Sequence, residues 1–322
     1  MKIQEIDKGS LDSYSKFALK HGGVFSQLNW LSIYGNDLKI MGIYNNDRTL
    51  IGSFCLYYSE IFFSSHIKNP PYSPFIALII NNSTKNKSNS LSFEKSVIAL
   101  IAEFINKLSF TILTIAFPPE FKDMQPFIWN GYKVIPNYTY KYDIQSASID
   151  ELMECMSPER RNDIRKAQKD EIEIKLTTNY KEVKEIIIKT FFRKEKKINY
   201  ILLEKILCGF ANKNNSFAFV AYKKNQPIAC SFCIYDKQTA YYLLGGYDEL
   251  HKHQGAGANA VWNAVLHAKK IGLSYFDFEG SMIQPVEKFF RGFGASLVPY
   301  FTVNKASLPI EVGLKFIKRG QF

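Results

Sequence analysis

Two acidic residues end a short apolar segment late in the chain, and their spacing suits proton transfer. The segment reads Phe276-Asp277-Phe278-Glu279-Gly280-Ser281, and its alternation predicts that Asp277 and Glu279 share one face of a strand. A carboxylate at a strand end beside a cleft can accept the proton of an attacking amine. Either residue alone could instead form a structural salt bridge or cap. Asp277 and Glu279 are therefore alternative candidates for a general base.

Two cations follow in the segment Lys288-Phe289-Phe290-Arg291-Gly292-Phe293-Gly294. A cation in such a turn, set among aromatic residues and glycines, can contact a phosphate or a carbonyl oxygen. Arg291 or Lys288 is thus a candidate for steadying a developing oxyanion. The alternative interpretation is that the aromatic residues are ordinary core.

The loop Lys252-His253-Gln254-Gly255-Ala256-Gly257 lies between an expected strand and an expected helix. Backbone amides and the dipole at a helix N-terminus favour anions, and glycines let a pyrophosphate come close. The spacing is similar to the loop by which GNAT acyltransferases hold coenzyme A, although lysine replaces the usual glutamine or arginine at its first position. The resemblance implies donor-binding residues at Lys252, Gln254, Gly255, Ala256 and Gly257. A plain tight turn is the alternative.

A basic helix is predicted after Ser157-Pro158-Glu159, which supply an N-cap, a first-position proline and an acidic first turn. Arg161 and Arg165 then fall on one face at helical spacing, with Lys166 beside them. Arginine presents forked donors that match phosphate. We expect these three residues to bind a phosphate-bearing substrate, unless this is only a solvated helix face.

These candidate residues lie in the second half of a chain that repeats itself. Ser53-Phe54-Cys55-Leu56-Tyr57 recurs as Ser231-Phe232-Cys233-Ile234-Tyr235, and residues 127–132 with Pro136 match residues 289–293 with Pro299. In both halves the second match follows a helix-like run and a strand-like run. Such an offset indicates duplicated domains. We predict an α/β fold of two domains, residues 1–146 and 147–322, each with a mixed, mostly antiparallel sheet flanked by helices.

The expected elements can be placed by periodicity and by turn signals. The first half contains helices at 11–21 and 91–108, strands within 38–60, 110–117 and 138–144, a proline-rich loop at 69–74 and a polar loop at 81–90. The second contains helices at 180–194 and 201–212 and strands at 241–245 and 273–279. We expect the first half to form a wall of the acceptor site, bordered by the proline-rich loop.

The net charge and the composition indicate which classes of partner this protein can bind. The 322 residues carry a formal net charge of +11, which attracts a nucleotide, transfer RNA or anionic lipid headgroups, or else serves solubility alone. No apolar run is long enough to cross a bilayer, and the acidic N-terminal segment is no secretory signal. An odd count of five cysteines indicates a reducing cytoplasm. Cys230 and Cys233 should point to opposite faces of a strand, so no metal site is expected.

Together these segments resemble the FemABX-like family, peptidyl and acyl transferases built as tandem GNAT domains. The likeness covers most of the chain and rests on residues 160–167, Tyr242-Leu243-Leu244-Gly245-Gly246, residues 276–281, and residues 289–294 followed by Pro299-Tyr300. It implies substrate contacts at Tyr242, Gly246, Ser281 and Lys288. Phe290 stands where that family usually has a lysine near the transferred acyl group, so the cationic role is either lost or passed to Arg291.

The resemblance implies transfer of an activated acyl group onto an amine by direct attack. We expect an N-acyltransferase that moves an acyl group from acyl-CoA to an amine of a nucleotide- or lipid-linked precursor of the cell envelope or of a polysaccharide. One alternative is a peptidyltransferase of peptidoglycan precursors that uses aminoacyl-tRNA. Another is a non-catalytic binder of RNA or of an anionic glycolipid, and peripheral contact with an anionic membrane is compatible with each. The oligomeric state stays open.

Overall fold

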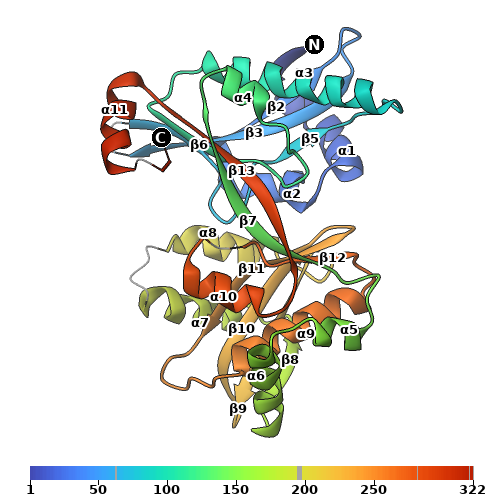
Figure 1. Cartoon of the computed structure of the whole chain (residues 1–322), viewed down its shortest axis with the longest axis vertical. Coiled ribbons are helices and arrows are strands. Elements are labelled where there is room, and N and C mark those ends of the chain that lie inside the picture. The colour runs from blue at the N-terminus through green and yellow to red at the C-terminus, as the bar shows by residue number, and fades with distance from the viewer. Residues whose placement is uncertain (62–63, 194–197, 281, 319, 322) are drawn as a thin grey trace. The chain divides into compact units, whose positions relative to one another are not determined.

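The structure is a computed structural model that describes residues 1–61, 64–193, 198–280, 282–318 and 320–321 (Figure 1). The chain folds into two compact units. Unit 1 comprises Met1–Asn137 and Pro299–Phe322, and unit 2 comprises Tyr138–Val298. The chain passes between the units within two long strands.

Unit 1 is built on a mixed sheet with the strand order β1-β2-β3-β4-β6-β13. The strands are β1 (Lys2–Glu5), β2 (Leu38–Tyr44), β3 (Leu50–Ile61), β4 (Ser64–Lys68), β6 (Ile112–Ala116) and β13 (Ser296–Ala306), with β5 (Leu78–Ile80) paired to β3. The helices are α1 (Leu11–His21), α2 (Leu28–Leu31), α3 (Lys87–Asn106), α4 (Gln125–Trp129) and α11 (Leu308–Ile317). Apolar side chains of α3 and of the strands, including Phe54 and Ile101, form the core.

Unit 2 has the strand order β7-β12-β11-β10-β9-β8. The strands are β7 (Lys133–Asp143), β8 (Glu173–Thr177), β9 (Ser216–Lys223), β10 (Gln226–Tyr235), β11 (Thr239–Tyr247) and β12 (Tyr275–Asp277). The helices are α5 (Ile149–Glu154), α6 (Pro158–Lys169), α7 (Tyr180–Arg193), α8 (Tyr200–Glu204), α9 (Ala256–Lys270) and α10 (Gln284–Arg291). Adjacent residues of β10 contact different helices: Cys230 Sγ lies 3.9 Å from the carbonyl of Val183 in α7, and Ser231 Oγ donates to Ala260 of α9. The two helices therefore cover opposite faces of the sheet.

The two sheets repeat one pairing pattern, which confirms the duplication. In unit 1 the strands pair antiparallel from β1 to β4, β4 and β6 pair parallel, and β6 and β13 pair antiparallel. Unit 2 shows the same sequence of pairings from β8 through β11, then parallel to β12 and antiparallel to β7. The repeated Ser-Phe-Cys segments occupy β3 and β10, the third strand of each series. The predicted mixed, mostly antiparallel sheets flanked by helices are confirmed.

The last strand of each half belongs to the other unit. β7 follows the unit 1 elements in sequence, yet its Tyr140 and Tyr142 are buried in the core of unit 2. β13 follows the unit 2 elements, yet its Val303 is fully buried in the core of unit 1. This exchange differs from the division predicted at residue 146, because residues 299–322 group with unit 1.

Several local expectations can be compared with the elements. Ser148 and Glu151 form a capping box at the start of α5, and the predicted N-cap Ser157 caps α6 by accepting from the amide of Arg160. The polar loop predicted at 81–90 ends earlier, because Asn86 caps α3 and the helix begins at Lys87. Among the described residues no helix is long and apolar enough to cross a membrane.

Candidate functional site

Asp277 is held in place by hydrogen bonds at the end of β12. Its Oδ1 accepts from the hydroxyl of Thr139 on β7 and, at 2.8 Å, from the backbone amide of Glu279. The predicted strand therefore stops at Asp277, and the chain turns there instead of continuing its alternation to Glu279. Because Asp277 fixes both this turn and the neighbouring strand, its carboxylate has a structural task.

Glu279 is half-buried as a whole residue, but its carboxyl oxygen Oε1 is buried. Its backbone lies in the left-handed region with φ of 57°, which is uncommon for a residue with a side chain. Among the described residues its buried Oε1 has no hydrogen-bond partner. Burial, and then the charge of Asp277, raise the pKa of Glu279 well above its ordinary value. Strain and an unsatisfied carboxyl group in one residue are features that cluster at functional sites.

Gly280 explains how this turn fits against the sheet. It also has a positive φ of 57°, and a Cβ atom there would lie 2.1 Å from the carbonyl oxygen of Tyr138. Only glycine allows this approach. The turn that carries Glu279 is thus pressed directly against β7. Ser281, the next predicted site residue, lies outside the described residues.

β11 and β12 are paired over only a short length. Their parallel register joins residues 239–241 to residues 275–277, and β11 continues to Tyr247 without β12 beside it. A register shift at Phe232–Cys233 of β10 adds an irregularity at the same level. The two parallel strands therefore separate next to the turn that carries Glu279.

Tyr242 is the predicted site residue nearest this separation. Burial, followed by the Cys230 and Cys233 thiols, raises the pKa of its hydroxyl. That hydroxyl folds over Gly245, where an added Cβ would lie only 1.6 Å away. The pKa of Cys233 is raised by burial and then by the charge of Glu279. Cys233 and Tyr242 are direct partners across β10 and β11, at the level where β11 leaves β12.

Two glycines that the sequence suggests as ligand contacts are occupied by the protein itself. At Gly246 an added Cβ would lie 2.9 Å from the carbonyl of Ile186 in α7, and at Gly255 it would lie 1.9 Å from the carbonyl of Asp163 in α6. Both glycines allow a helix to pack closely. At Gly257, apart from its chain neighbours and the backbone of its own helix, no described atom lies within 4 Å of an added Cβ. Of these three, Gly257 alone has open space for a ligand.

The loop before α9 is tied to α6. Gln254 Nε2 donates to Asp163 Oδ1 at 2.9 Å, and Lys166 Nζ donates to Gln254 Oε1 at 3.3 Å. Lys252 is exposed and lies over the Tyr247 ring. Ala256 is buried in the first turn of α9. The structure thus gathers the predicted donor loop and Lys166 at one helix N-terminus.

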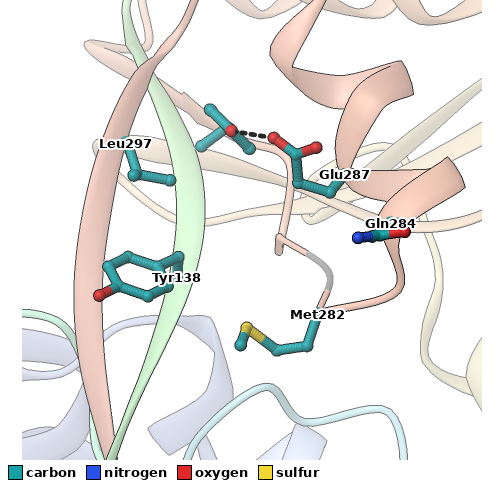
Figure 2. A pocket seen from close by; sticks show the side chains of 6 residues that line it. Tyr138, Met282, Gln284, Glu287 and Leu297 are labelled. Atoms are coloured by element: carbon teal, nitrogen blue, oxygen red, sulfur yellow. Dashed lines mark hydrogen bonds between the residues drawn. The ribbon is translucent and has the colours of Figure 1, made fainter.

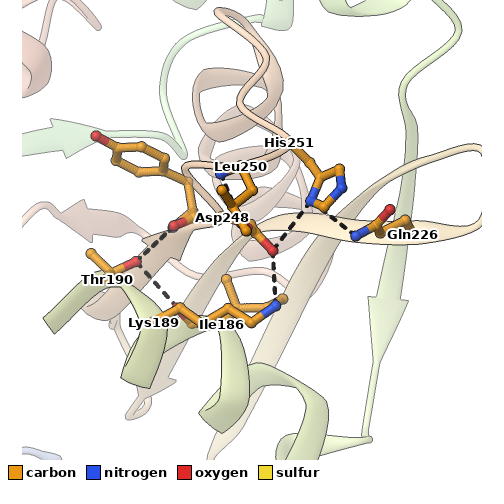
Figure 3. Close-up of polar contacts among 8 residues, drawn as sticks. Ile186, Lys189, Thr190, Gln226, Asp248, Leu250 and His251 are labelled. Atoms are coloured by element: carbon orange, nitrogen blue, oxygen red, sulfur yellow. Dashed lines mark hydrogen bonds and ion pairs between the residues drawn. The ribbon is translucent and has the colours of Figure 1, made fainter. Parts of the chain in front are cut away.

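The start of this loop is fixed by residues that the sequence analysis did not single out (Figure 3). Asp248 Oδ2 lies 2.8 Å from Lys189 Nζ of α7 and 3.5 Å from His251 Nδ1. The hydrogen bond from Lys189 holds the pKa of the buried Asp248 below its ordinary value. The side-chain nitrogen Nε2 of Gln226 lies 2.9 Å from Nδ1 of His251, so Gln226 belongs to the same cluster.

The basic helix α6 divides its cations among different tasks. Arg161 donates to the carbonyls of Glu154 and Met156, at 3.0 Å each, and so caps the end of α5. Arg165 is exposed. Arg160, which the sequence analysis left out of the site, is buried with its guanidinium 4.3 Å from the Phe289 ring centroid and 2.7 Å from Asp163. A buried arginine gives no sequence signal within a uniformly basic segment.

The cations of α10 are exposed and paired with acids. Arg291 Nε lies 2.9 Å from Glu287 Oε1, and Lys288 Nζ lies 3.9 Å from Glu159. Phe290 is buried, in agreement with the core interpretation of the aromatic residues. The structure does not bring Arg291 to the buried carboxyl group of Glu279 by any contact among the described residues.

A pocket of about 280 Å³ opens beside β7 and α10 (Figure 2). It is lined by Tyr138, Tyr140, Met282, Gln284, Glu287 and Leu297. Glu287 accepts from the Tyr140 hydroxyl and from Arg291 through the same oxygen, which keeps the pKa of Glu287 low. Tyr138 borders both the pocket and, through its carbonyl, the turn at Gly280. The pocket therefore begins next to the turn that carries Glu279.

Comparison with known proteins places this geometry in a known fold. A family model described as an acetyltransferase (GNAT) domain matches residues 200–285. The structure is similar to FemX, with a TM-score of 0.65 and 12% identity over 94% of this chain and 97% of FemX. A comparison with curated proteins found no match.

Two further solved structures are similar over their whole length. L-PGS from Bacillus licheniformis has a TM-score of 0.57 and 13% identity over 99% of this chain and 98% of L-PGS. The C-terminal domain of a candidate lysylphosphatidylglycerol synthetase from Agrobacterium fabrum has a TM-score of 0.58 and 9% identity over 95% of both chains. At sequence identities of 12%, 13% and 9%, the similarity to these three structures shows a shared fold. The predicted resemblance to FemABX-like proteins and the GNAT-like fold are confirmed at that level.

Proposed function

We propose that this protein transfers an acyl group from an activated carbonyl to an amine, and that Glu279 is the general base. The observation that carries the proposal is the buried Oε1 of Glu279, which has no hydrogen-bond partner in the part of the chain that the structure describes and lies beside the point where β11 and β12 separate. A carboxyl group with a raised pKa is suited to taking a proton near neutral pH. The GNAT-like fold supports acyl transfer as the reaction class.

In this mechanism the amine nitrogen attacks the carbonyl carbon and forms the new C–N bond. Glu279 accepts the proton that the nitrogen loses, and the bond from the carbonyl carbon to the leaving group breaks. Asp277 is a positioning residue, because it holds the amide of Glu279 and the hydroxyl of Thr139. Stabilisation of the carbonyl oxygen by Arg291 or Lys288 stays a prediction, since both are paired with exposed acids in this structure.

We propose acyl-CoA as the donor. Its phosphates would lie at the N-terminus of α9, where Gly257 leaves open space and where Lys252 and Lys166 supply positive charge. Arg165 is exposed on the adjacent α6 and can contribute to the same field. Gly255 would serve packing, because the backbone of Asp163 occupies the space beside it. The chemistry supplied by the donor is a thioester, whose thiolate is a good leaving group.

For the acceptor we propose an amine of a lipid- or nucleotide-linked cell-envelope precursor, whose non-reacting part occupies the pocket beside β7. Tyr138 and Leu297 would contact that part, because both line the pocket that adjoins the Gly280 turn. A lysylphosphatidylglycerol synthetase candidate among the similar structures supports a lipid-linked acceptor. Acyl transfer from charged transfer RNA is the second candidate, favoured by the net charge of +11.

The decisive experiment measures thiol release from acyl-CoA with a panel of amine acceptors. Glu279→Gln should lower kcat/KM by about 100-fold to 10,000-fold, the usual contribution of a general base, while acyl-CoA still raises the melting temperature. Glu249→Gln, an exposed carboxylate of the same unit, serves as the matched control. A kcat/KM of Glu279→Gln within tenfold of the value for the unsubstituted protein would overturn the assignment of the base. Stabilisation by charged transfer RNA and none by acyl-CoA would replace the donor.

A further inference from the structure

The helix α11 carries its apolar side chains on the outside. Leu308 and Phe316 are 80% and 86% exposed, and Val312 and Ile317 are exposed with them. None of its residues is buried, and the half-buried positions include the acidic Glu311. Surface helices of globular proteins normally show the reverse pattern, with the apolar side toward the core. The exposed fractions of these side chains show that no described part of unit 1 covers this side of α11.

The exposed side chains form a continuous stripe. Leu308, Val312 and Phe316 follow one another at intervals of four residues, so they lie on the same side of the helix. Single exposed apolar residues are normal, but a contiguous exposed stripe marks a surface that binds another apolar phase. Ile310 and Ile317 are also exposed, but helical spacing places them further around α11, more than a right angle away from Val312.

The charges around this stripe indicate the charge of the surface that it binds. Lys315 and Lys318 are exposed in and just after the last turn of α11, and Lys315 also pairs with Glu311 at 2.8 Å. The whole chain carries a net charge of +11. A second copy of so basic a chain would be repelled, whereas an anionic surface would be attracted. Apolar side chains flanked by lysines match the interface of an anionic bilayer, where the stripe would lie at the acyl boundary and the lysines among the headgroups.

We propose that α11 docks the protein onto membranes rich in anionic phospholipid. The helix would lie in the plane of the interface and insert Leu308, Val312 and Phe316. This inference rests on unit 1 and is independent of the catalytic proposal for Glu279, so either can fail without the other.

The test is co-sedimentation of the full chain with vesicles of phosphatidylglycerol and phosphatidylcholine, compared with pure phosphatidylcholine. We expect binding to the anionic vesicles that weakens with salt. The double substitution Leu308→Ser and Phe316→Ser should lower the partition coefficient at least tenfold. Because both side chains are exposed, folding should not change, and the melting temperature verifies this. The matched control is Leu250→Ser, which removes a side chain 89% exposed in unit 2 and should bind as the unsubstituted protein does.

Two results would overturn the proposal. The first is equal vesicle binding by the unsubstituted protein and by the double variant. The second is an absence of vesicle binding together with a dimer, measured by analytical ultracentrifugation, that the double variant abolishes, because α11 would then pair two copies of the chain. Replacing Lys315 and Lys318 by glutamine provides a separate measurement: binding to anionic vesicles should fall about tenfold, and the residual binding should depend less steeply on salt.

Discussion

Glu279→Gln should lower activity strongly and at the same time stabilise the fold. In the folded protein the Oε1 of Glu279 is buried with no hydrogen-bond partner among the described residues. Leaving a buried polar group unsatisfied costs about 1–3 kcal/mol, and more when the group is charged. Glutamine keeps the shape and still places a polar atom there, but it cannot carry the charge. We therefore expect the free energy of unfolding to rise at pH 8 by the extra cost of burying a charged instead of a neutral group, on the order of 1–3 kcal/mol. For a domain of this size each kcal/mol raises the melting temperature by roughly 2–4 °C.

The pH dependence of this gain has a definite sign. Because burial raises the pKa of Glu279 in the folded state, the folded protein keeps this proton at pH values where the unfolded chain has lost it. The unfolded state therefore binds fewer protons, and stability falls as pH rises from about the ordinary carboxyl pKa through the raised folded pKa. The stabilisation by Glu279→Gln should be small near pH 4 and grow toward pH 8.

Thermal unfolding of both proteins between pH 4 and pH 8, followed by calorimetry, measures this difference directly. Glu287→Gln is the matched control, since the pKa of Glu287 is lowered by its bonds to Tyr140 and Arg291. Its substitution should destabilise the protein at every pH above the ordinary carboxyl pKa, and least at pH 4. A Glu279→Gln protein that is less stable than the unsubstituted one at pH 8 would refute the reasoning, because the carboxylate would then have a favourable partner.

Three further predictions follow from packing and exposure. Gly255→Ala should destabilise by about 1–3 kcal/mol, since its Cβ would meet the backbone of α6, whereas Gly257→Ala should leave stability unchanged or higher; chemical denaturation compares the two. Arg160→Met should lower the free energy of unfolding by about 3–5 kcal/mol, because the buried carboxylate of Asp163 loses its cation. A smaller loss in chemical denaturation would show that solvent reaches Asp163. Native thiol labelling should modify the exposed Cys155 and Cys208 rapidly and the three buried cysteines only after unfolding, as mass spectrometry can count.

Much of the fold can be predicted from the sequence because its signals are local. Helix starts at Ser148 and Ser157 carry cap chemistry, and the repeated strand has the same apolar pattern in both halves. The duplication then follows from the order of these elements. The partners of the final strands could not be predicted, because pairing β13 with β6 joins segments far apart in sequence and no local residue encodes it.

At the candidate site, several contacts depend on tertiary packing and could not be predicted from the local sequence. Asp277 and Glu279 are brought together, but by a left-handed turn and a side-chain cap instead of strand alternation. Gly255 belongs to the expected phosphate-binding loop and Gly246 to the expected substrate contacts, yet helix backbones fill the space beside both glycines. Only tertiary packing distinguishes a glycine that admits a ligand from one that admits a neighbouring helix.

The exchange of final strands has a consequence for how the chain is made. Until the ribosome has synthesised residues 296–306, β6 lacks its outer antiparallel partner and presents an unpaired edge. The sheet of the first half can therefore be completed only when nearly the whole polypeptide has been synthesised. Pairing of strands so far apart in sequence favours slow folding that chaperones assist. Cutting the gene between the repeats would yield two fragments that each lack a core strand, and co-expression of both would be required to restore either one.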